Sequence, residues 1–193
     1  MSKIFYLMGK SASGKDTIYR KVKEQMPELK TFVIYTTRPI REGEQKGREY
    51  HFVDYAKLKE LQEAGKVIEL REYNTVHGIW KYFTADDGQF AGDDNYLAIG
   101  TLESYVQLRD YFGQERLVPI YVEVEDGLRL ERALARERMQ ATPKYEEMCR
   151  RFLADAADFS VENLKEAGIT RKFTNMDVDK CVQGIILDIQ GNM

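Results

Sequence analysis

The stretch Gly9-Lys10-Ser11-Ala12-Ser13-Gly14-Lys15-Asp16-Thr17 decides the fold of this chain. It follows a short apolar run, residues 4–7, and precedes a segment with helical periodicity, residues 17–25. Two glycines permit backbone turns, so successive N–H groups of such a loop can point at phosphate oxygens at the start of a helix. The lysine adds a positive charge between the β- and γ-phosphates. This order of strand, loop and helix predicts a phosphate-binding loop, and a chance glycine-rich turn is the alternative.

The loop also predicts the ligands of ATP and Mg²⁺. Asp16 stands where such loops usually carry Ser or Thr. A carboxylate beside phosphates is repulsive unless a cation lies between them, and Mg²⁺ prefers oxygen ligands. We therefore expect Mg²⁺ at Asp16 and Thr17, unless Asp16 turns away and stabilises the start of the helix. The residues expected at ATP in this loop are Gly9, Ser11, Ala12, Ser13, Gly14, Lys15, Asp16 and Thr17.

Composition limits the classes of function that remain. A chain of 193 residues with 43% hydrophobic residues suits one domain with a sizeable core. The net charge of −3 does not favour nucleic-acid binding. No apolar run approaches the ~20 residues of a membrane span, and the apolar start is too short for a secretory signal. The two cysteines form no zinc-ligand spacing. We expect a cytoplasmic protein without nucleic-acid, membrane or obligate protein partners.

Strand-like and helix-like segments alternate along the chain, which predicts an α/β fold around a parallel sheet. Strands are expected at residues 4–7, 31–35, 50–53, 67–70, 96–99, 117–124 and 171–174. Helices are expected at residues 17–25, 54–64 with Asp54 as N-cap, 102–111, 127–139, 144–164 and 178–189.

A second motif lies in the segment 35–52. Arg38 and Arg41 stand on a stretch with Pro and Gly, and two guanidinium groups there could clamp a phosphate. Tyr50 could add a phenolic donor. Taken alone, the segment is better explained as a solvated basic loop.

From here the chain resembles guanylate kinases. The segment Thr36 to Phe52 is similar to that family's TTR-x-x-R-x-G-E and G-R/K-D/E-Y-x-F motifs. The similarity continues in Ile68-Glu69, Val76-His77-Gly78 and Tyr82-Phe83-Thr84. The resemblance implies a P-loop kinase core (1–35, 85–126 and 158–193) with an inserted acceptor-binding subdomain (36–84) and a helical lid (127–157). It implies Mg²⁺-dependent transfer of the γ-phosphate of ATP to GMP or dGMP, giving ADP and the diphosphate.

The resemblance also implies the roles of individual residues. The acceptor phosphate would be held by Arg38, Arg41, Tyr50 and Tyr82, with Glu44 orienting the arginines. Glu69 would accept from guanine N1–H and the 2-amino group, which suits an acceptor-only carboxylate, and Thr84 would contact O6. In the lid, Arg136, Arg138 and Arg151 would bind phosphates, and with Lys15 and Arg38 they would form the catalytic set. Arg132 of the lid and Asn175, which follows the last expected strand, would contact adenine. A solvated, salt-bridged helix is the alternative for the lid arginines.

Several positions depart from the family pattern. Ile34 stands where a guanine-contacting serine is usual, and Ala98 and Gly100 stand where the family carries acids. Residues 85–94 replace what is normally a helix. A related kinase acting on another phosphorylated acceptor, such as ribose 1,5-bisphosphate, therefore remains open. A non-catalytic module that binds phosphopeptides is a further alternative, although such modules generally lose the loop lysine.

Overall fold

A four-stranded parallel sheet forms the centre of the protein in the computed structural model, which describes residues 2–75 and 78–193. Its strand order is β6 (Tyr96–Gly100), β1 (Ile4–Met8), β7 (Leu117–Glu123) and β8 (Lys172–Thr174). All five side chains of β1 are buried and they alternate between two cores, one on each face of the sheet. A strand covered on both faces reads as one continuous apolar run, as β1 does in the sequence.

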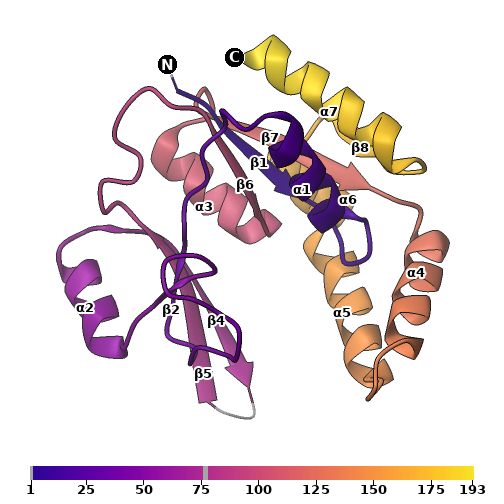
Figure 1. Cartoon of the computed structure of the whole chain (residues 1–193), viewed down its shortest axis with the longest axis horizontal. Coiled ribbons are helices and arrows are strands. Elements are labelled where there is room, and N and C mark those ends of the chain that lie inside the picture. Colours follow the sequence, from indigo (N-terminus) through magenta and orange to yellow (C-terminus); the bar gives the residue numbers. More distant parts are fainter. Residues whose placement is uncertain (1, 76–77) are drawn as a thin grey trace.

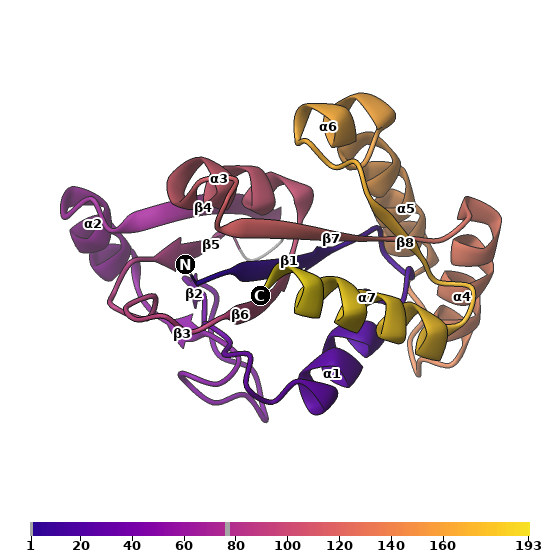
Figure 2. The same ribbon diagram turned by 90° about the horizontal axis from the view of Figure 1, so that it is seen from above.

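Helices cover both faces of this sheet (Figure 2). On one face lie α1 (Lys15–Gln25) and α7 (Val178–Asn192), whose Ile18, Val22 and Ile185 pack against Phe5 and Leu7 of β1. On the other face lie α3 (Leu102–Phe112) and α6 (Val161–Glu166), whose buried residues pack with the opposite side chains of β1. The result is the three-layer α/β core that the sequence predicts.

A second sheet extends from the core as a separate lobe (Figure 1). Its order is β3 (His51–Phe52), β2 (Tyr35–Thr36), β5 (Gly78–Ala85) and β4 (Val67–Thr75), with β4 and β5 antiparallel. Helix α2 (Tyr55–Glu63) packs on it through Leu58 and Leu61. Asp54 begins α2 as expected, because its carboxylate accepts from the Lys57 backbone N–H at 2.8 Å.

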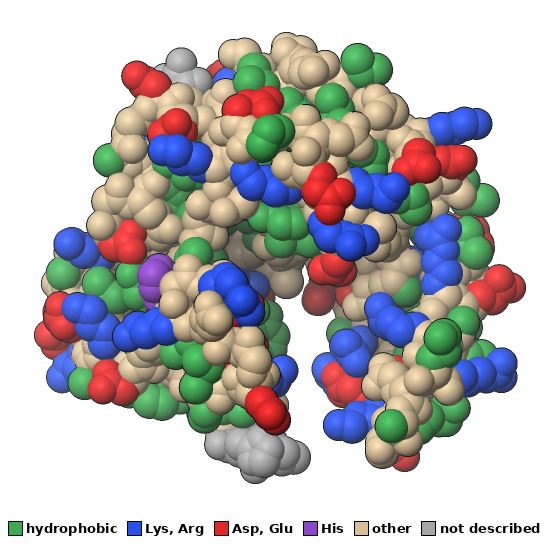
Figure 3. Space-filling model, viewed as in Figure 1, with side chains coloured by type: hydrophobic (Ala, Val, Ile, Leu, Met, Phe, Trp, Pro, Cys, Tyr) green, Lys and Arg blue, Asp and Glu red, His purple; other side chains and the backbone are tan. Residues whose placement is uncertain are grey.

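A third lobe consists of α4 (Asp126–Arg138) and α5 (Tyr145–Asp158). The space-filling view shows a deep notch between this helical lobe and the lobe of the second sheet (Figure 3). None of the helices within the described residues is long and apolar enough to cross a bilayer. Cys149 is exposed and Cys181 is buried, and neither forms a disulfide.

Two element predictions are wrong in detail, and one strand was missed. The strand expected at 31–35 is reduced to Tyr35–Thr36, because the Val33 N–H donates to the Gln89 side chain instead of to a neighbouring strand. The helix expected at 144–164 is divided into α5 and α6, because Ser160 caps a new helix by accepting from the Asn163 N–H. Strand β5 was not expected at all. Residues 86–95 form an irregular loop, in agreement with the departure noted in the sequence.

Candidate active site

The phosphate loop joins β1 to α1, and its two glycines are required by close contacts. A Cβ at Gly9 would lie 2.5 Å from the Val122 carbonyl oxygen of β7. Gly14 has a φ of 85°, and a Cβ there would lie 2.4 Å from the Asn175 amide nitrogen. That amide donates to the Ser13 carbonyl at 2.8 Å and is buried. Strand β7 and the segment after β8 therefore pack closely against the loop and leave no room for a Cβ at either glycine.

Ala12 is the non-glycine residue with a positive φ, 62°, among those described. L-residues adopt this conformation at a cost of about 1 kcal/mol or more, and such positions concentrate at ligand-binding loops. The strain supports the interpretation of residues 9–15 as a loop shaped for a ligand.

The two residues expected to bind Mg²⁺ lie in the first turn of α1. Asp16 and Thr17 are both exposed, and Asp16 lies 3.6 Å from the Lys15 ammonium group. Asp16 does not cap the helix, since the N-cap is Gly14 and has no side-chain cap bond. Within residues 2–75 and 78–193, no cluster of three or more His, Cys, Asp or Glu side chains could hold a metal alone. One carboxylate and one hydroxyl beside a phosphate loop nevertheless fit Mg²⁺, which commonly takes its other ligands from phosphates and water.

A cleft of about 770 Å³ opens beside the phosphate loop. Gly9, Ser11 and Lys15 line one end, and α3, α5 and α6 line its walls. Tyr73 of β4 also lines the cleft, and its ring meets the Tyr82 ring edge-on at 5.5 Å. The cleft therefore connects Lys15 with the lobe that carries the predicted acceptor residues.

The predicted acceptor-phosphate residues come together around Arg38. Its guanidinium is almost fully buried and binds both oxygens of Glu44, at 2.9 and 2.7 Å. The same guanidinium lies over the Tyr50 ring, and the Tyr50 and Tyr82 rings are in contact. Glu44 also accepts from the Arg41 backbone N–H at 2.8 Å. The prediction that Glu44 orients the arginines is therefore consistent with this geometry.

The charge of Glu44 is stabilised by this arrangement. The hydrogen bond from Arg38 is the main cause that lowers the Glu44 pKa to about 2, and the Arg41 N–H adds to it. The Arg41 side chain is exposed and lies over the Trp80 ring, 5.9 Å from its centroid. Arg41 therefore lies at the exposed edge of the cluster, whereas Arg38 is buried within it.

Glu69 lies in a separate pocket of about 240 Å³ between the second sheet and the core. Its side chain is 1% exposed and accepts from three donors. Arg71 donates from Nε to Oε2 at 2.9 Å and from Nη2 to Oε1 at 3.3 Å. Thr84 donates to Oε1 at 2.8 Å, so its hydroxyl points to Glu69 in this structure and not into the open pocket. Ile34, Ala98 and Ile99 add apolar walls.

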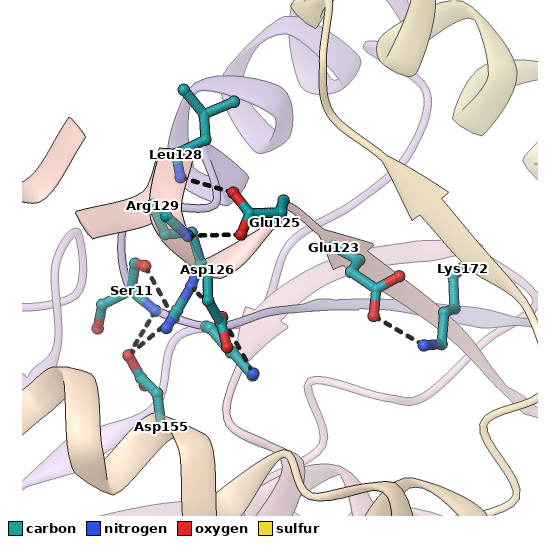
Figure 4. A network of polar contacts seen from close by, with 10 residues as sticks. Ser11, Glu123, Glu125, Asp126, Leu128, Arg129, Asp155 and Lys172 are labelled. Carbon is teal, nitrogen blue, oxygen red and sulfur yellow. Dashed lines mark hydrogen bonds and ion pairs between the residues drawn. The ribbon is translucent and has the colours of Figure 1, made fainter. Parts of the chain in front are cut away.

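The helical lobe is attached to the phosphate loop by a network around Arg129 (Figure 4). The Arg129 guanidinium is 1% exposed, donates to the Ser11 carbonyl at 3.2 Å, and pairs with Asp126 at 3.1 Å and Asp155 at 3.5 Å. Asp155 in turn accepts from the Ser11 N–H at 2.8 Å. Both backbone groups of Ser11 are therefore held by the helical lobe.

The four predicted lid arginines divide into three groups. Arg132 donates to the Asn175 backbone carbonyl at 3.3 Å, so the predicted adenine contacts lie together. The Asn175 side chain itself supports Ser13, and its contact with adenine stays a prediction. Arg136 and Arg151 line one small cavity with Ser11. Arg138 is exposed and does not line that cavity.

Comparisons with known proteins agree with these motifs. The guanylate kinase family model matches residues 1–79. Relatives include guanylate kinases of Rhodopseudomonas palustris, 47% identical over 66 residues (34% of this chain and 30% of the relative), and of Nocardia farcinica, 43% identical over 76 residues (39% and 38%). The guanylate kinase of Bordetella pertussis is 37% identical over 100 residues, which is 50% of this chain and 45% of the relative. The matched part of the chain therefore spans less than half the length of these relatives.

Residues 1–79 are thus similar to guanylate kinases. The likeness in fold covers more of the chain. A crystal structure of guanylate kinase from Anaplasma phagocytophilum matches 98% of this chain and 85% of that chain, with a TM-score of 0.63 and 22% identity. At this identity the likeness concerns the fold, and it supports the P-loop kinase architecture for the whole chain.

Within this guanylate kinase fold, one departure from the family pattern has a structural explanation. A Cβ at Gly100 would lie 1.9 Å from the Tyr6 hydroxyl, which bonds to Ser104. Tyr6 therefore occupies the space that a side chain at Gly100 would need. Burial raises the Tyr6 pKa to about 12, so this hydroxyl stays protonated.

Four site residues were missed by sequence reasoning, namely Tyr6, Arg71, Arg129 and Asp155. Arg71 had a usable signal, because residues two apart on a strand share a face and Arg71 follows Glu69 by two. The contact of Tyr6 with Ser104, and those of Arg129 and Asp155 with Ser11, had none, because these partners lie far away in the sequence. The motif residues Val76 and His77 lie outside the described residues.

Proposed function

We propose that this protein is a kinase that transfers the γ-phosphoryl group of Mg²⁺–ATP to GMP or dGMP. The observation that carries the proposal is the cleft that has Lys15 at one end and reaches Tyr73, beside the Arg38–Tyr50–Tyr82 cluster, at the other. The relatives named guanylate kinase support the same reaction. The lobe of the second sheet corresponds to the proposed acceptor-binding subdomain (36–84), and α4 with α5 corresponds to the proposed lid (127–157).

The mechanism needs positioning and positive charge more than covalent chemistry. The loop N–H groups and Lys15 would hold the β- and γ-phosphates of ATP. Arg38, Arg41 and Tyr50 would hold the acceptor phosphate, one oxygen of which attacks the γ-phosphorus in line while ADP leaves. Mg²⁺ held by Asp16 and Thr17 would offset charge on the phosphate oxygens.

The lid would supply the remaining positive charge. Arg136 and Arg151 both line a small cavity beside Ser11, which supports the proposal that they would approach the transferred phosphate oxygens when α4 and α5 close. Arg132 would stack on adenine near Asn175. Arg138 would need a change of conformation to join them.

The test is a coupled assay of ADP formation with GMP, dGMP, AMP, UMP and ribose 1,5-bisphosphate as acceptors. Turnover of GMP and dGMP above all others is expected. Lys15→Ala should reduce it by about 10³-fold or more through loss of phosphate charge stabilisation. Lys21→Ala is the matched control, since Lys21 is on the same helix and pairs with Asp179. Turnover of ribose 1,5-bisphosphate in place of GMP, or an active Lys15→Ala, would contradict the proposal. Binding of GMP without any turnover would favour a non-catalytic module.

A further inference from the structure

Arg71 stands in the middle of the proposed base pocket. It lies on β4 two residues after Glu69, so both side chains leave the same face of the strand. Only 10% of the Arg71 side chain is exposed, and its Nε and Nη2 groups bind the two oxygens of Glu69. Of the acidic side chains within residues 2–75 and 78–193, Glu69 is the one that forms an ion pair with Arg71.

This contact uses the face of Glu69 that a guanine would use. A guanidinium fork presents two parallel N–H donors to the two oxygens of a carboxylate. Guanine also presents two parallel N–H donors, at N1 and at the 2-amino group, and their spacing likewise matches the two oxygens of a carboxylate. Arg71 and guanine therefore compete for one surface, and a guanine that binds Glu69 in this manner must displace Arg71.

A displaced Arg71 needs new acceptors, because it stays charged in a nearly closed pocket. The protein offers few. Ile34, Ala98 and Ile99 are apolar walls. The space at Gly100 is filled by Tyr6, so β6 cannot supply a carboxylate there.

Arg48, Glu49 and Thr84, which also line the pocket, are already engaged. Glu49 accepts from Gln45 N–H and from Arg48, and Arg48 also donates to the Gly43 carbonyl. The Thr84 hydroxyl donates to Glu69. The edge of a bound guanine next to N1 carries two acceptors, O6 and N7, and the guanidinium fork is the standard two-donor match to that pair.

We propose that Arg71 is a specificity-determining residue that moves from Glu69 to the O6 and N7 atoms of guanine when the acceptor binds. This inference rests on the proposed function, and it assigns recognition of the O6 and N7 edge of guanine to Arg71. Glu69 then selects for the N1–H and 2-amino donors, and Arg71 selects for the O6 and N7 acceptors. Adenine retains N7 but presents an amino donor at position 6 and lacks the N1–H and 2-amino donors, so it satisfies Arg71 only in part and Glu69 not at all.

The test compares equilibrium binding of GMP and 7-deaza-GMP by calorimetry, together with kcat/KM for both. 7-Deaza-GMP retains every group except the N7 acceptor. Wild type should prefer GMP by about tenfold, as expected for loss of half of a bidentate base contact. Arg71→Met should bring this ratio near one and should weaken GMP binding. Arg116→Lys is the control, because Arg116 is a half-buried arginine that does not line the pocket and donates to the Phe90 carbonyl. Its ratio should equal that of wild type.

Each outcome has a definite meaning. If Arg71→Met does not fold, the wild-type ratio still decides, and Arg71→Lys keeps a cation beside Glu69 while it removes the planar fork, so its ratio should also decrease. A wild-type ratio near one, an unchanged ratio in Arg71→Met, or tighter GMP binding by Arg71→Met would overturn the proposal. Binding of GMP with N7 dependence but no turnover would overturn only the proposed kinase activity. Failure of wild type to bind GMP would overturn both.

Discussion

Arg129 offers the sharpest test of how the helical lobe is attached to the phosphate loop. Arg129→Met retains much of the side-chain volume that packs on Phe152 but removes the charge. It leaves Asp155, whose side chain is 16% exposed, without its cation, and it removes the donor to the Ser11 carbonyl. Loss of a fully buried partner costs about 3–5 kcal/mol. Asp155 is partly solvated, so we expect the free energy of unfolding to fall by about 2–3 kcal/mol.

For a chain of this length that loss corresponds to a decrease in Tm of about 4–12 °C, measured by scanning calorimetry at neutral pH. Arg150→Met is the matched control, since Arg150 is on α5 in an exposed pair with Glu147. Such a surface pair contributes at most about 1 kcal/mol. Asp155→Asn, made alone and with Arg129→Met, completes a double-mutant cycle whose coupling energy should exceed about 1 kcal/mol. Equal decreases in Tm for Arg129→Met and Arg150→Met, or additive effects in the cycle, would refute the reasoning.

Two further predictions concern charged groups of the proposed site. Asp16→Ser should strengthen binding of ATP without metal, because it removes an uncompensated like charge, and should weaken binding of Mg²⁺–ATP; calorimetric titrations with EDTA and with Mg²⁺ test this, and equal shifts in both would exclude Asp16 as a metal ligand. The lowered pKa of Glu44, about 2, means that its carboxylate stabilises the fold above its unfolded pKa of about 4.5 and that this contribution is lost as the pH falls toward 2. Glu44→Gln should therefore lower Tm at pH 7 and make little difference near pH 2.5, and a difference independent of pH would contradict the assigned Arg38–Glu44 pair.

Local patterns were enough to identify the core and the phosphate loop. The loop residues lie next to one another in the chain, and the apolar run of β1 reports a strand buried on both faces. The cap at Asp54 depends on atoms three residues apart. In the acceptor segment, Arg38, Glu44 and Tyr50 also lie within one short stretch, so their cluster follows from neighbouring residues once the loop folds back.

Contacts between distant segments decided the rest. The family resemblance implied that Glu69 and Thr84 both contact a guanine base, whereas in the structure Thr84 and Arg71 both bind Glu69. Gly100 stands where the family pattern has an acid, and in the structure the absence of a side chain there leaves room for Tyr6. The break between α5 and α6 is an exception, because it follows from a local cap at Ser160 that helical periodicity alone did not reveal.

The sequence by itself determined that this protein has a phosphate loop on an α/β core with arginines and carboxylates in the order of the guanylate kinases. Only the tertiary structure decided which of those charges face each other. The physical reason is that motifs and periodicity report interactions within a few residues, whereas burial and ion pairing depend on what the fold brings into contact. Asp155 and Ser11, or Asn175 and Gly14, meet across most of the chain, so no local pattern encodes them.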